Sequence, residues 1–323
     1  MLNIILHAIQ ALFSIIFMIA IGYGLAKKGW FDEKGSKMLA LLVTEVSLPL
    51  YMIDNMMKNF TRDKLLAMAP DLVLPILSVL LALLVGKLTV HLANVQEGRR
   101  GVFTVNFFIA NTMFIGLPVN LALFGEKSIP AVMLYYMVNT IMFWTLGMHY
   151  LLLDTEEGRA AAAKQGIFNP TALKKLFSPA LIGFLIGTGL VLLNIKLPVF
   201  LLSSFKYVGS MTTPLSLIFI GIEMSRIPLR DIRFDKDMWC SLFGRFCVCP
   251  VCVLLLVPFI HITPLSAQVF TMQAAMPAMT QMAIVTKSIG GDAGYAATLC
   301  LLTVLAGIVV IPAYMAIVSL VIL

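Results

Sequence analysis

One apolar stretch of the chain carries residues that are unfavourable in a lipid-exposed helix. Asn111 and Thr112 have hydrogen-bonding side chains, and Gly116 and Pro118 weaken or interrupt helical backbone. They lie in an apolar run about twenty residues long, which is the length a helix needs to cross a bilayer. Interrupted backbone at membrane depth is tolerated only where protein or a water-filled cavity satisfies it. These residues therefore predict a broken transmembrane helix at a binding site.

A second stretch of the same kind lies in the C-terminal half. Pro277 interrupts an apolar run that also carries Thr280 and Gln281. We expect the breaks at Ala110–Pro118 and Met276–Thr280 to face each other as two crossing, discontinuous helices. Each break creates a helix N-terminus whose free N–H groups and dipole favour an anion. The side chains predicted to supply directional hydrogen bonds are those of Asn111, Thr112, Thr280 and Gln281.

The composition predicts an all-α integral membrane protein. Of 323 residues, 60% are hydrophobic and 12% are charged, with a mean hydropathy of +0.97. Ordinary soluble domains have roughly 45–50% apolar and about 25% charged residues. The apolar runs are continuous rather than alternating, which argues against a β-barrel. The ten expected spans are Ile4–Ala26, Met38–Met57, Leu72–Leu92, Val102–Phe124, Ile129–Leu153, Phe177–Ile195, Val199–Ile222, Met238–Ile260, Leu265–Val285 and Ala293–Leu323.

The basic residues indicate how the spans are oriented. Sixteen Lys or Arg residues lie in loops after odd-numbered spans and five in loops after even-numbered spans, with Lys206 and Arg245 inside spans. Because cytoplasmic loops carry the excess of Lys and Arg, both termini are expected outside the cell membrane. The net charge of +7 is then a topology signal and not a nucleic-acid-binding patch.

The polar connection Asp154–Ser178 divides the expected helices into two sets of five. We predict a first repeat over residues 1–153, a cytoplasmic connecting loop over 154–178 and a second repeat over 179–323. Five spans is an odd number, so related halves would be inverted repeats, as in many secondary transporters. Weak sequence echoes support this: Pro49 in "SLPLYMI" aligns with Pro214 in "TTPLSLI". The stretch "ANTMFIGLP" likewise aligns with "PAMTQMAIV".

Three segments resemble the auxin efflux carrier family, which includes plant PIN proteins and bacterial relatives proposed to carry malonate and similar organic acids. They are "SLPLY" at Ser47–Tyr51, "NTMFIGLP" at Asn111–Pro118 and "QAAMPAMTQMAIVTKSIG" at Gln273–Gly290. With the expected topology, the resemblance covers essentially the whole chain. It implies a scaffold domain of helices 1, 2, 6 and 7 and a transport domain of helices 3–5 and 8–10. Substrate would sit between them, with elevator-type alternating access and a homodimer through the scaffold helices.

Two residues carry over from the family's motifs. Asn111 matches the asparagine that meets the substrate carboxylate, and Pro277 matches the crossover proline of the ninth helix. Ala110 departs from the family, which has a proline there, and predicts a softer first break. Ser47 and Gln273 complete the predicted substrate-binding set. The residues predicted to shape or support the crossover are Ala110, Gly116, Pro118, Pro49, Pro214 and Asn139, the last with helix–helix hydrogen bonding as its alternative role.

Three ionisable residues fall inside expected spans. Glu45 lies in the middle of the second span, where a carboxylate costs roughly 2.5–3.5 kcal/mol to insert. It is expected either to be protonated or hydrogen-bonded for structural reasons, or to be a proton-coupling group whose pKa burial raises. Arg245 is expected to snorkel to the cytoplasmic interface, with attraction of an anion as the alternative. Lys206 is likewise expected either to snorkel to the interface or to attract an anion, in its case from the outer side.

Other chemistry is not indicated. Cys247 and Cys249 would point about 200° apart on a helix, and no His or carboxylate accompanies them, so we expect no metal site. No Walker, paired-histidine zinc or serine-hydrolase motif occurs, so neither an enzyme nor a cofactor is expected. The sequence predicts a secondary carrier of a small organic anion, such as a malonate-like or auxin-like mono- or dicarboxylate. The alternatives are a non-transporting membrane sensor or structural subunit, a channel, and a Na⁺-coupled symporter.

Overall fold

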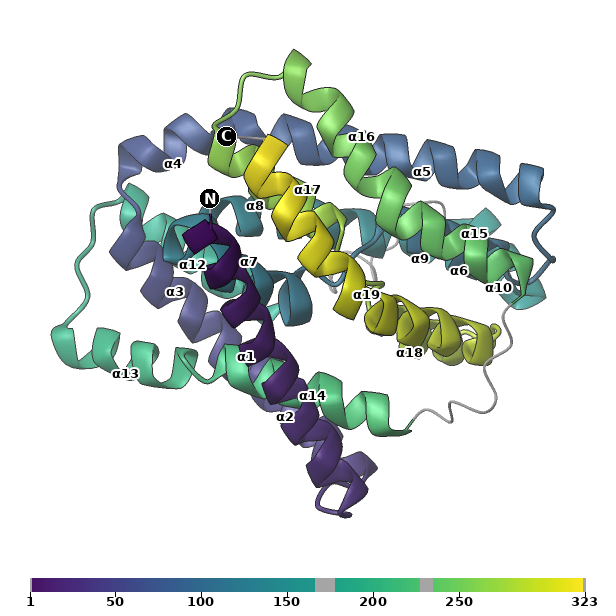
Figure 1. Cartoon of the computed structure of the whole chain (residues 1–323), viewed down its shortest axis with the longest axis horizontal. Coiled ribbons are helices and arrows are strands. Elements are labelled where there is room, and N and C mark those ends of the chain that lie inside the picture. Colours follow the sequence, from purple (N-terminus) through teal and green to yellow (C-terminus); the bar gives the residue numbers. More distant parts are fainter. Residues whose placement is uncertain (1, 166–177, 227–234, 322–323) are drawn as a thin grey trace. The chain divides into compact units, whose positions relative to one another are not determined.

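The computed structural model describes residues 2–165, 178–226 and 235–321, and these ranges are predominantly helical (Figure 1). They contain no strand, and the one isolated antiparallel bridge found in them joins Ala110 to Ala278. The prediction of an all-helical chain is therefore confirmed. The chain divides into two compact units. Unit 1 comprises Met1–Pro70, Met113–Met133 and Phe177–Pro228, and unit 2 comprises Asp71–Thr112, Leu134–Leu176 and Leu229–Leu323.

Unit 1 is built on two closely packed helix pairs. Its described helices are α1 (Leu2–Lys27), α2 (Glu33–Leu41), α3 (Leu48–Asn59), α4 (Arg62–Met68), α7 (Leu117–Phe124), α12 (Pro179–Leu192), α13 (Val199–Gly209) and α14 (Thr212–Arg226). The most extensive packing joins α1 to α14 and α12 to α3. Glycines permit both approaches. A Cβ on Gly22 would lie 2.0 Å from the carbonyl oxygen of Ile218, and one on Gly183 would lie 2.5 Å from that of Pro49. Small residues of this kind let membrane helices meet backbone to backbone.

Unit 2 holds the two helix segments that end at the predicted breaks. Its described helices are α5 (Val73–Ala93), α6 (Arg100–Phe108), α9 (Met148–Leu152), α10 (Glu156–Gln165), α15 (Lys236–Phe243), α16 (Cys249–Leu256), α17 (Pro264–Ala274), α18 (Gln281–Ser288) and α19 (Ala293–Val321), and α8 (Ile129–Met142) enters it from unit 1. α5 runs beside α6 and α16 (Figure 1). An apolar cluster that includes Val90, Phe103 and Phe107 fixes α6 on α5. The predicted connecting loop begins with α10, and its residues 166–177 lie outside the described part.

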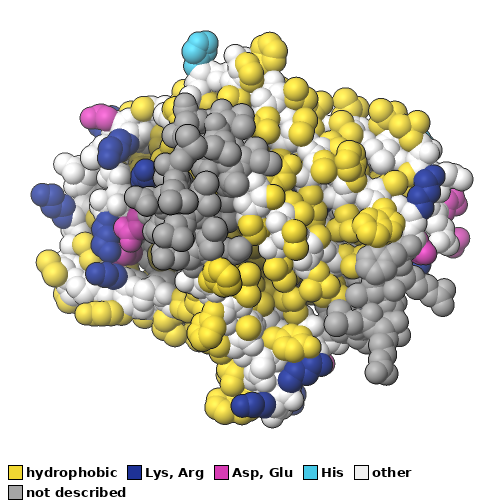
Figure 2. Space-filling model, in the orientation of Figure 1, with side chains coloured by type: hydrophobic (Ala, Val, Ile, Leu, Met, Phe, Trp, Pro, Cys, Tyr) yellow, Lys and Arg dark blue, Asp and Glu magenta, His cyan; other side chains and the backbone are white. Residues whose placement is uncertain are grey.

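The described helices fit a membrane protein but show fewer long spans than expected. Six of them are long and apolar enough to cross a bilayer, and Phe13–Lys27, Thr112–Phe124 and Pro179–Leu192 form shorter apolar helices. The expected ninth span is divided between α17 and α18. Figure 2 shows hydrophobic side chains spread over the visible face, with few charged side chains among them. Exposed Phe17, Leu84 and Phe200 are examples. Such a surface suits contact with lipid better than contact with water.

Two backbone features were not predicted. Four described spans contain a π-helical segment, namely η1 (Leu42–Ser47), η3 (Thr112–Gly116), η5 (Phe143–Gly147) and η7 (Gly244–Val248). The expected seventh span is also interrupted between Gly209 and Thr212. The chain is closely packed at this point, since a Cβ on Gly209 would lie 2.8 Å from the Cα of Tyr51. π-Segments concentrate at functional sites, and three of these contain residues considered below.

Candidate functional site

The two interrupted helices meet inside unit 2. α6 ends at Phe108, residues 109–111 are extended, and the helix resumes as η3; α17 ends at Ala274 and α18 begins at Gln281. The extended segments pair, because the N–H of Asn111 donates to the carbonyl oxygen of Pro277 at 2.8 Å beside the bridge at Ala110. The expectation that the two breaks face each other is confirmed. The hydrogen bonds that the backbone loses within each helix are partly replaced across the crossing.

Each break is also held by one polar side chain from the next span of its own half. The Asn139 amide accepts from the N–H of Ala110 at 2.9 Å and donates to its carbonyl oxygen at 3.0 Å. The Thr303 hydroxyl accepts from the N–H of Ala278 at 3.0 Å. Both side chains are buried. These bonds fit both roles predicted for Asn139, support of the crossover and helix–helix hydrogen bonding. Thr303 was missed, and its only sequence signal is a hydroxyl within the apolar run of α19.

Four of the predicted substrate-binding residues come together at this crossing. Asn111 and Thr112 are 3% and 2% exposed, and Gln273 is fully buried beside them, donating from its Nε2 to the carbonyl oxygen of Thr112 at 3.3 Å. Pro277 lies in the paired segment. The Oε1 atom of Gln273 has no hydrogen-bond partner in the described part of the chain. Because this open group of Gln273 is an acceptor, the side-chain donors that the site offers to a carboxylate are the Asn111 amide and the Thr112 hydroxyl.

Two further predicted binding residues, Thr280 and Gln281, lie at the start of α18. Thr280 is half-buried and Gln281 is exposed. Thr280, the N-cap residue of α18, makes no capping hydrogen bond through its own side chain. An uncapped helix start keeps free N–H groups, which favour negative charge. This end of the crossing is therefore electropositive in character.

The prediction that Arg245 snorkels to the interface is wrong. Arg245, in η7, is 1% exposed and its guanidinium points at backbone. One terminal nitrogen donates to the carbonyl oxygens of Asn106 at 3.0 Å and Ile109 at 2.8 Å, and the other donates to that of Ala274. These oxygens belong to the C-terminal ends of α6 and α17, whose carbonyls lack partners within their helices. Since the carbonyl dipoles attract the cation more strongly than the interface does, Arg245 stays buried.

A cysteine completes the same contact. The Cys249 thiol donates to the carbonyl oxygen of Phe107, and Cys249 and Cys252 are buried while Cys247 is exposed. Buried Cys249 and exposed Cys247 thus face different ways, as their spacing predicted. Thus η7 and α16 together bond three carbonyl oxygens at the end of α6, those of Asn106, Phe107 and Ile109. This segment therefore satisfies the backbone on the α6 side of the first break.

The predicted residues of the second and seventh spans have other partners, all within unit 1. The Ser47 hydroxyl lies 2.8 Å from the carbonyl oxygen of Val208 and 2.7 Å from the Thr212 hydroxyl. The structure therefore gives Ser47 a helix-joining role. Pro49 lies in the first turn of α3 against α12, and Pro214 lies in the first turn of α14.

The segment after the first break also belongs to unit 1. Pro118 lies in the first turn of α7, and the carbonyl oxygen of Gly116 accepts from the Asn120 amide at 2.8 Å. Both predicted crossover residues are buried. The hydrogen bond between Asn120 and Gly116 stabilises the first turn of α7, where the fourth span becomes helical again.

The two remaining ionisable candidates have exposed side chains. Glu45 lies in η1 and Lys206 lies in α13, and both are exposed on unit 1. The expectation that Glu45 is buried within the protein is therefore not met.

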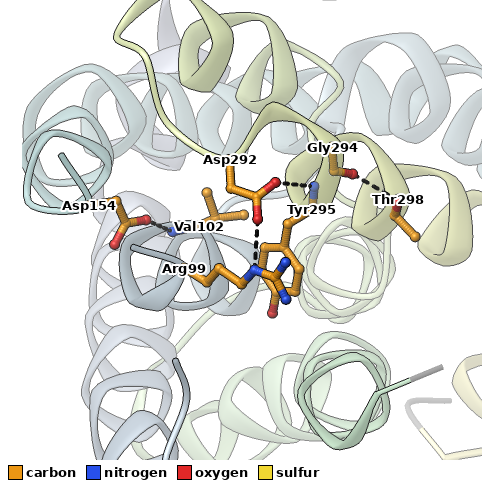
Figure 3. A network of polar contacts seen from close by, with 7 residues as sticks. All are labelled: Arg99, Val102, Asp154, Asp292, Gly294, Tyr295 and Thr298. Atoms are coloured by element: carbon orange, nitrogen blue, oxygen red, sulfur yellow. Dashed lines mark hydrogen bonds and ion pairs between the residues drawn. The ribbon is translucent and has the colours of Figure 1, made fainter. Parts of the chain in front are cut away.

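A separate polar network anchors the starts of α6 and α19 (Figure 3). The Nε atom of Arg99 lies 2.7 Å from the Asp292 carboxylate, and its guanidinium stacks over the ring of Tyr295. Asp154 accepts from the N–H groups of Gly101 and Val102. Burial raises the pKa of Asp154, while these two donors lower it. The network holds the N-terminal end of α6, the first half of the broken fourth span, in place.

Beside this network lies a cavity of about 340 Å³ in unit 2. Its lining includes Lys87, His91, Arg100, Tyr150 and Arg159, and it includes none of the predicted substrate-binding residues. The cavity and the crossing are therefore different features of unit 2.

The comparisons with known proteins agree with this architecture. A family model described as membrane transport protein matches residues 7–315. An uncharacterized transporter of Methanocaldococcus jannaschii is 26% identical over 271 residues, which cover 81% of this chain and 83% of that protein. An uncharacterized transporter of Methanothermobacter thermautotrophicus is 22% identical over 286 residues, covering 87% and 88%. The chain therefore belongs to the membrane transport protein family, that of the auxin efflux carriers, and is a membrane transporter and not an enzyme.

Proposed function

We propose that the protein is a secondary carrier of a small organic anion, a mono- or dicarboxylate, that binds beside the crossing. The observation that carries this proposal is the pairing of the two breaks at Ala110 and Ala278. It leaves two helix starts, whose N–H groups carry partial positive charge, next to the Asn111 amide and the Thr112 hydroxyl. A carboxylate matches such a set of donors in charge and in hydrogen bonding.

Two symmetric features support ten spans arranged as inverted halves. The first helix of each half packs on the second span of the other half, as α1 on α14 and α12 on α3. Each break is held by a side chain of the fifth span of its own half, Asn139 or Thr303. Both termini would lie outside the cell membrane.

The division into units supports elevator-type alternating access. Unit 1 contains the helices expected for the scaffold, and unit 2 contains most of those expected for transport, except that residues 113–133 belong to unit 1. In this mechanism unit 2 moves substrate past a dimeric scaffold formed by unit 1. Because the chain resembles auxin efflux carriers and their relatives proposed to carry malonate, a malonate-like or auxin-like anion is the favoured substrate.

The direct test is binding followed by flux. Purified protein should gain thermal stability from members of a carboxylate panel, because a ligand of the folded state shifts unfolding by mass action. The stabilising compounds should then be transported into proteoliposomes. A protein that binds a carboxylate but gives no flux would instead be a membrane sensor or structural subunit, and single-channel currents would identify a channel.

Asn111→Ala should weaken substrate binding by about tenfold to a hundredfold, because a hydrogen bond to a charged group contributes about 1.5–3 kcal/mol. Asn111→Asp, which has the same shape, should bind still more weakly since its carboxylate repels an anion. The measurement is the Kd from ligand-dependent shifts in melting temperature. Unchanged affinity in both variants would rule out Asn111 as a substrate ligand.

Glu45→Gln should abolish the dependence of flux on a pH gradient if Glu45 is the proton-coupling group. An exposed carboxylate in the second span can take up and release a proton without breaking protein contacts. The matched control is Glu126→Gln, which changes a second exposed carboxylate of unit 1. Flux is measured in proteoliposomes with and without a pH gradient. An unchanged pH response in the Glu45 variant would remove this residue from the mechanism.

A further inference from the structure

The C-terminal ends of the two half-helices form a second, oppositely charged end of the crossing. The carbonyl oxygens of Asn106 and Ile109 mark the end of α6, and that of Ala274 marks the end of α17. Each helix C-terminus carries a partial negative charge of roughly half an elementary charge. Two such ends meeting at one point make an oxygen-lined site for a cation.

This site has the chemistry that selects a monovalent metal cation. Carbonyl oxygens at half-helix C-termini are the groups that coordinate Na⁺ in transporters with discontinuous helices. Two further buried oxygens, the Oδ1 of Asn106 and the Oε1 of Gln273, belong to the same helix ends and have no partner in the described part of the chain. Neither oxygen bonds the Arg245 guanidinium, whose Nε atom also has no partner in the described part of the chain, so the carbonyl oxygens are the groups that hold the cation.

Arg245 already occupies this position. Its guanidinium contacts all three carbonyl oxygens, and in the described chain no carboxylate lies within ion-pair distance of it. A buried cation without a paired anion is unfavourable unless dipoles replace its hydration. The half-helix ends supply those dipoles, so the cation and the two helix ends stabilise one another.

We propose that the paired C-terminal ends of α6 and α17 are a monovalent-cation site that Arg245 fills with its own guanidinium. The carrier then needs no Na⁺, and the Na⁺-coupled alternative does not apply. A permanent cation also stays in unit 2 at the crossing where the anion binds. This inference rests on the proposed function for its transport consequence, but the existence of the site does not depend on transport.

The test uses the purified full-length protein without substrate, in NaCl, KCl or choline chloride at equal ionic strength. The melting temperature of the wild type should be the same in all three salts. Arg245→Ala should melt about 8 °C lower, because it leaves the helix ends without their cation. It should recover about 5 °C when Na⁺ or methylguanidinium is present at a hundredfold excess over its Kd. Arg245→Met, whose side chain fills the space, should recover with neither.

Two results would overturn the proposal. One is a wild type that Na⁺ stabilises relative to choline. The other is an Arg245→Ala variant that gains no more from Na⁺ or methylguanidinium than Arg245→Met. Should Arg245→Ala not fold, Arg245→Lys replaces it, since an ammonium in the site should permit folding; failure of the Lys variant would also count against a cation site.

Flux separates this inference from the proposed function. In proteoliposomes, carboxylate uptake by the wild type should be unchanged when choline replaces Na⁺ on both sides. Uptake that requires Na⁺ would refute the resident-cation role of Arg245 while leaving the carrier intact. Absence of any carboxylate uptake, with the melting results as expected, would refute the proposed function and leave the cation site in place.

Discussion

Replacing Asn139 with leucine is expected to lower the free energy of unfolding by about 4 kcal/mol. The Asn139 side chain is 1% exposed and bonds both the N–H and the carbonyl oxygen of Ala110. Leucine has similar volume but no polar atoms, so both backbone groups lose their partner. A buried donor or acceptor left unsatisfied costs about 1–3 kcal/mol. The melting temperature should fall by about 8 °C.

The structure provides both a probe and a control for this measurement. Buried Cys249 and Cys252 are free thiols, so a thiol-reactive dye reports when unfolding exposes them, after the early reaction of exposed Cys247. Thr145→Val is the matched control in the same span. The Thr145 hydroxyl donates to the carbonyl oxygen of Ile141 in its own helix, at 2.6 Å, so its loss should cost less than about 1 kcal/mol. Equal destabilisation by both variants would mean that Asn139 does not hold the break.

Gly22→Ala is expected to destabilise unit 1 by about 2 kcal/mol or more. Its Cβ would lie 2.0 Å from the carbonyl oxygen of Ile218, closer than two such atoms can approach. Since the obstructing atom belongs to the backbone of α14, the helices must separate along their contact. Overpacking of this kind typically costs 1–3 kcal/mol. The same reasoning applies to Gly221→Ala, whose Cβ would lie 1.9 Å from the carbonyl oxygen of Ile19.

The control lies two residues further along α1. A Cβ on Gly24 would meet nothing within 4 Å, so Gly24→Ala should stabilise the protein by about 0.5–1 kcal/mol through helix propensity alone. The two variants make the same chemical change in the same helix and should shift the melting temperature in opposite directions. If both shift it upward, the close approach of α1 and α14 is not present in the membrane protein.

The sequence alone predicted an apolar, helical chain. It also predicted the positions at which two of the helices break. Continuous apolar runs, only 12% charged residues and helix-interrupting residues near Asn111 and Pro277 are local features, and local features survive folding unchanged. The sequence also predicted that Asn139 either supports the crossover or makes a helix–helix hydrogen bond, since an amide inside a membrane helix needs a partner. The boundaries shifted by a few residues because helix ends depend on caps and contacts.

The burial and the hydrogen-bond partners of the ionisable and hydroxyl residues became apparent from the tertiary structure and not from the sequence. Arg245 in an apolar run has the same local sequence whether it snorkels or binds carbonyls, and its partner Asn106 lies 139 residues away. Thr303 and Ser47 are ordinary hydroxyl residues until their spans meet Ala278 and Thr212. Glu45 was expected to be buried in its span, but which face of a helix other helices cover is a property of packing. A sequence pattern shows that a polar side chain lies in an apolar run and that its burial there is unfavourable. The hydrogen-bond partners that offset this free energy belong to distant parts of the chain, so only the folded structure identifies them.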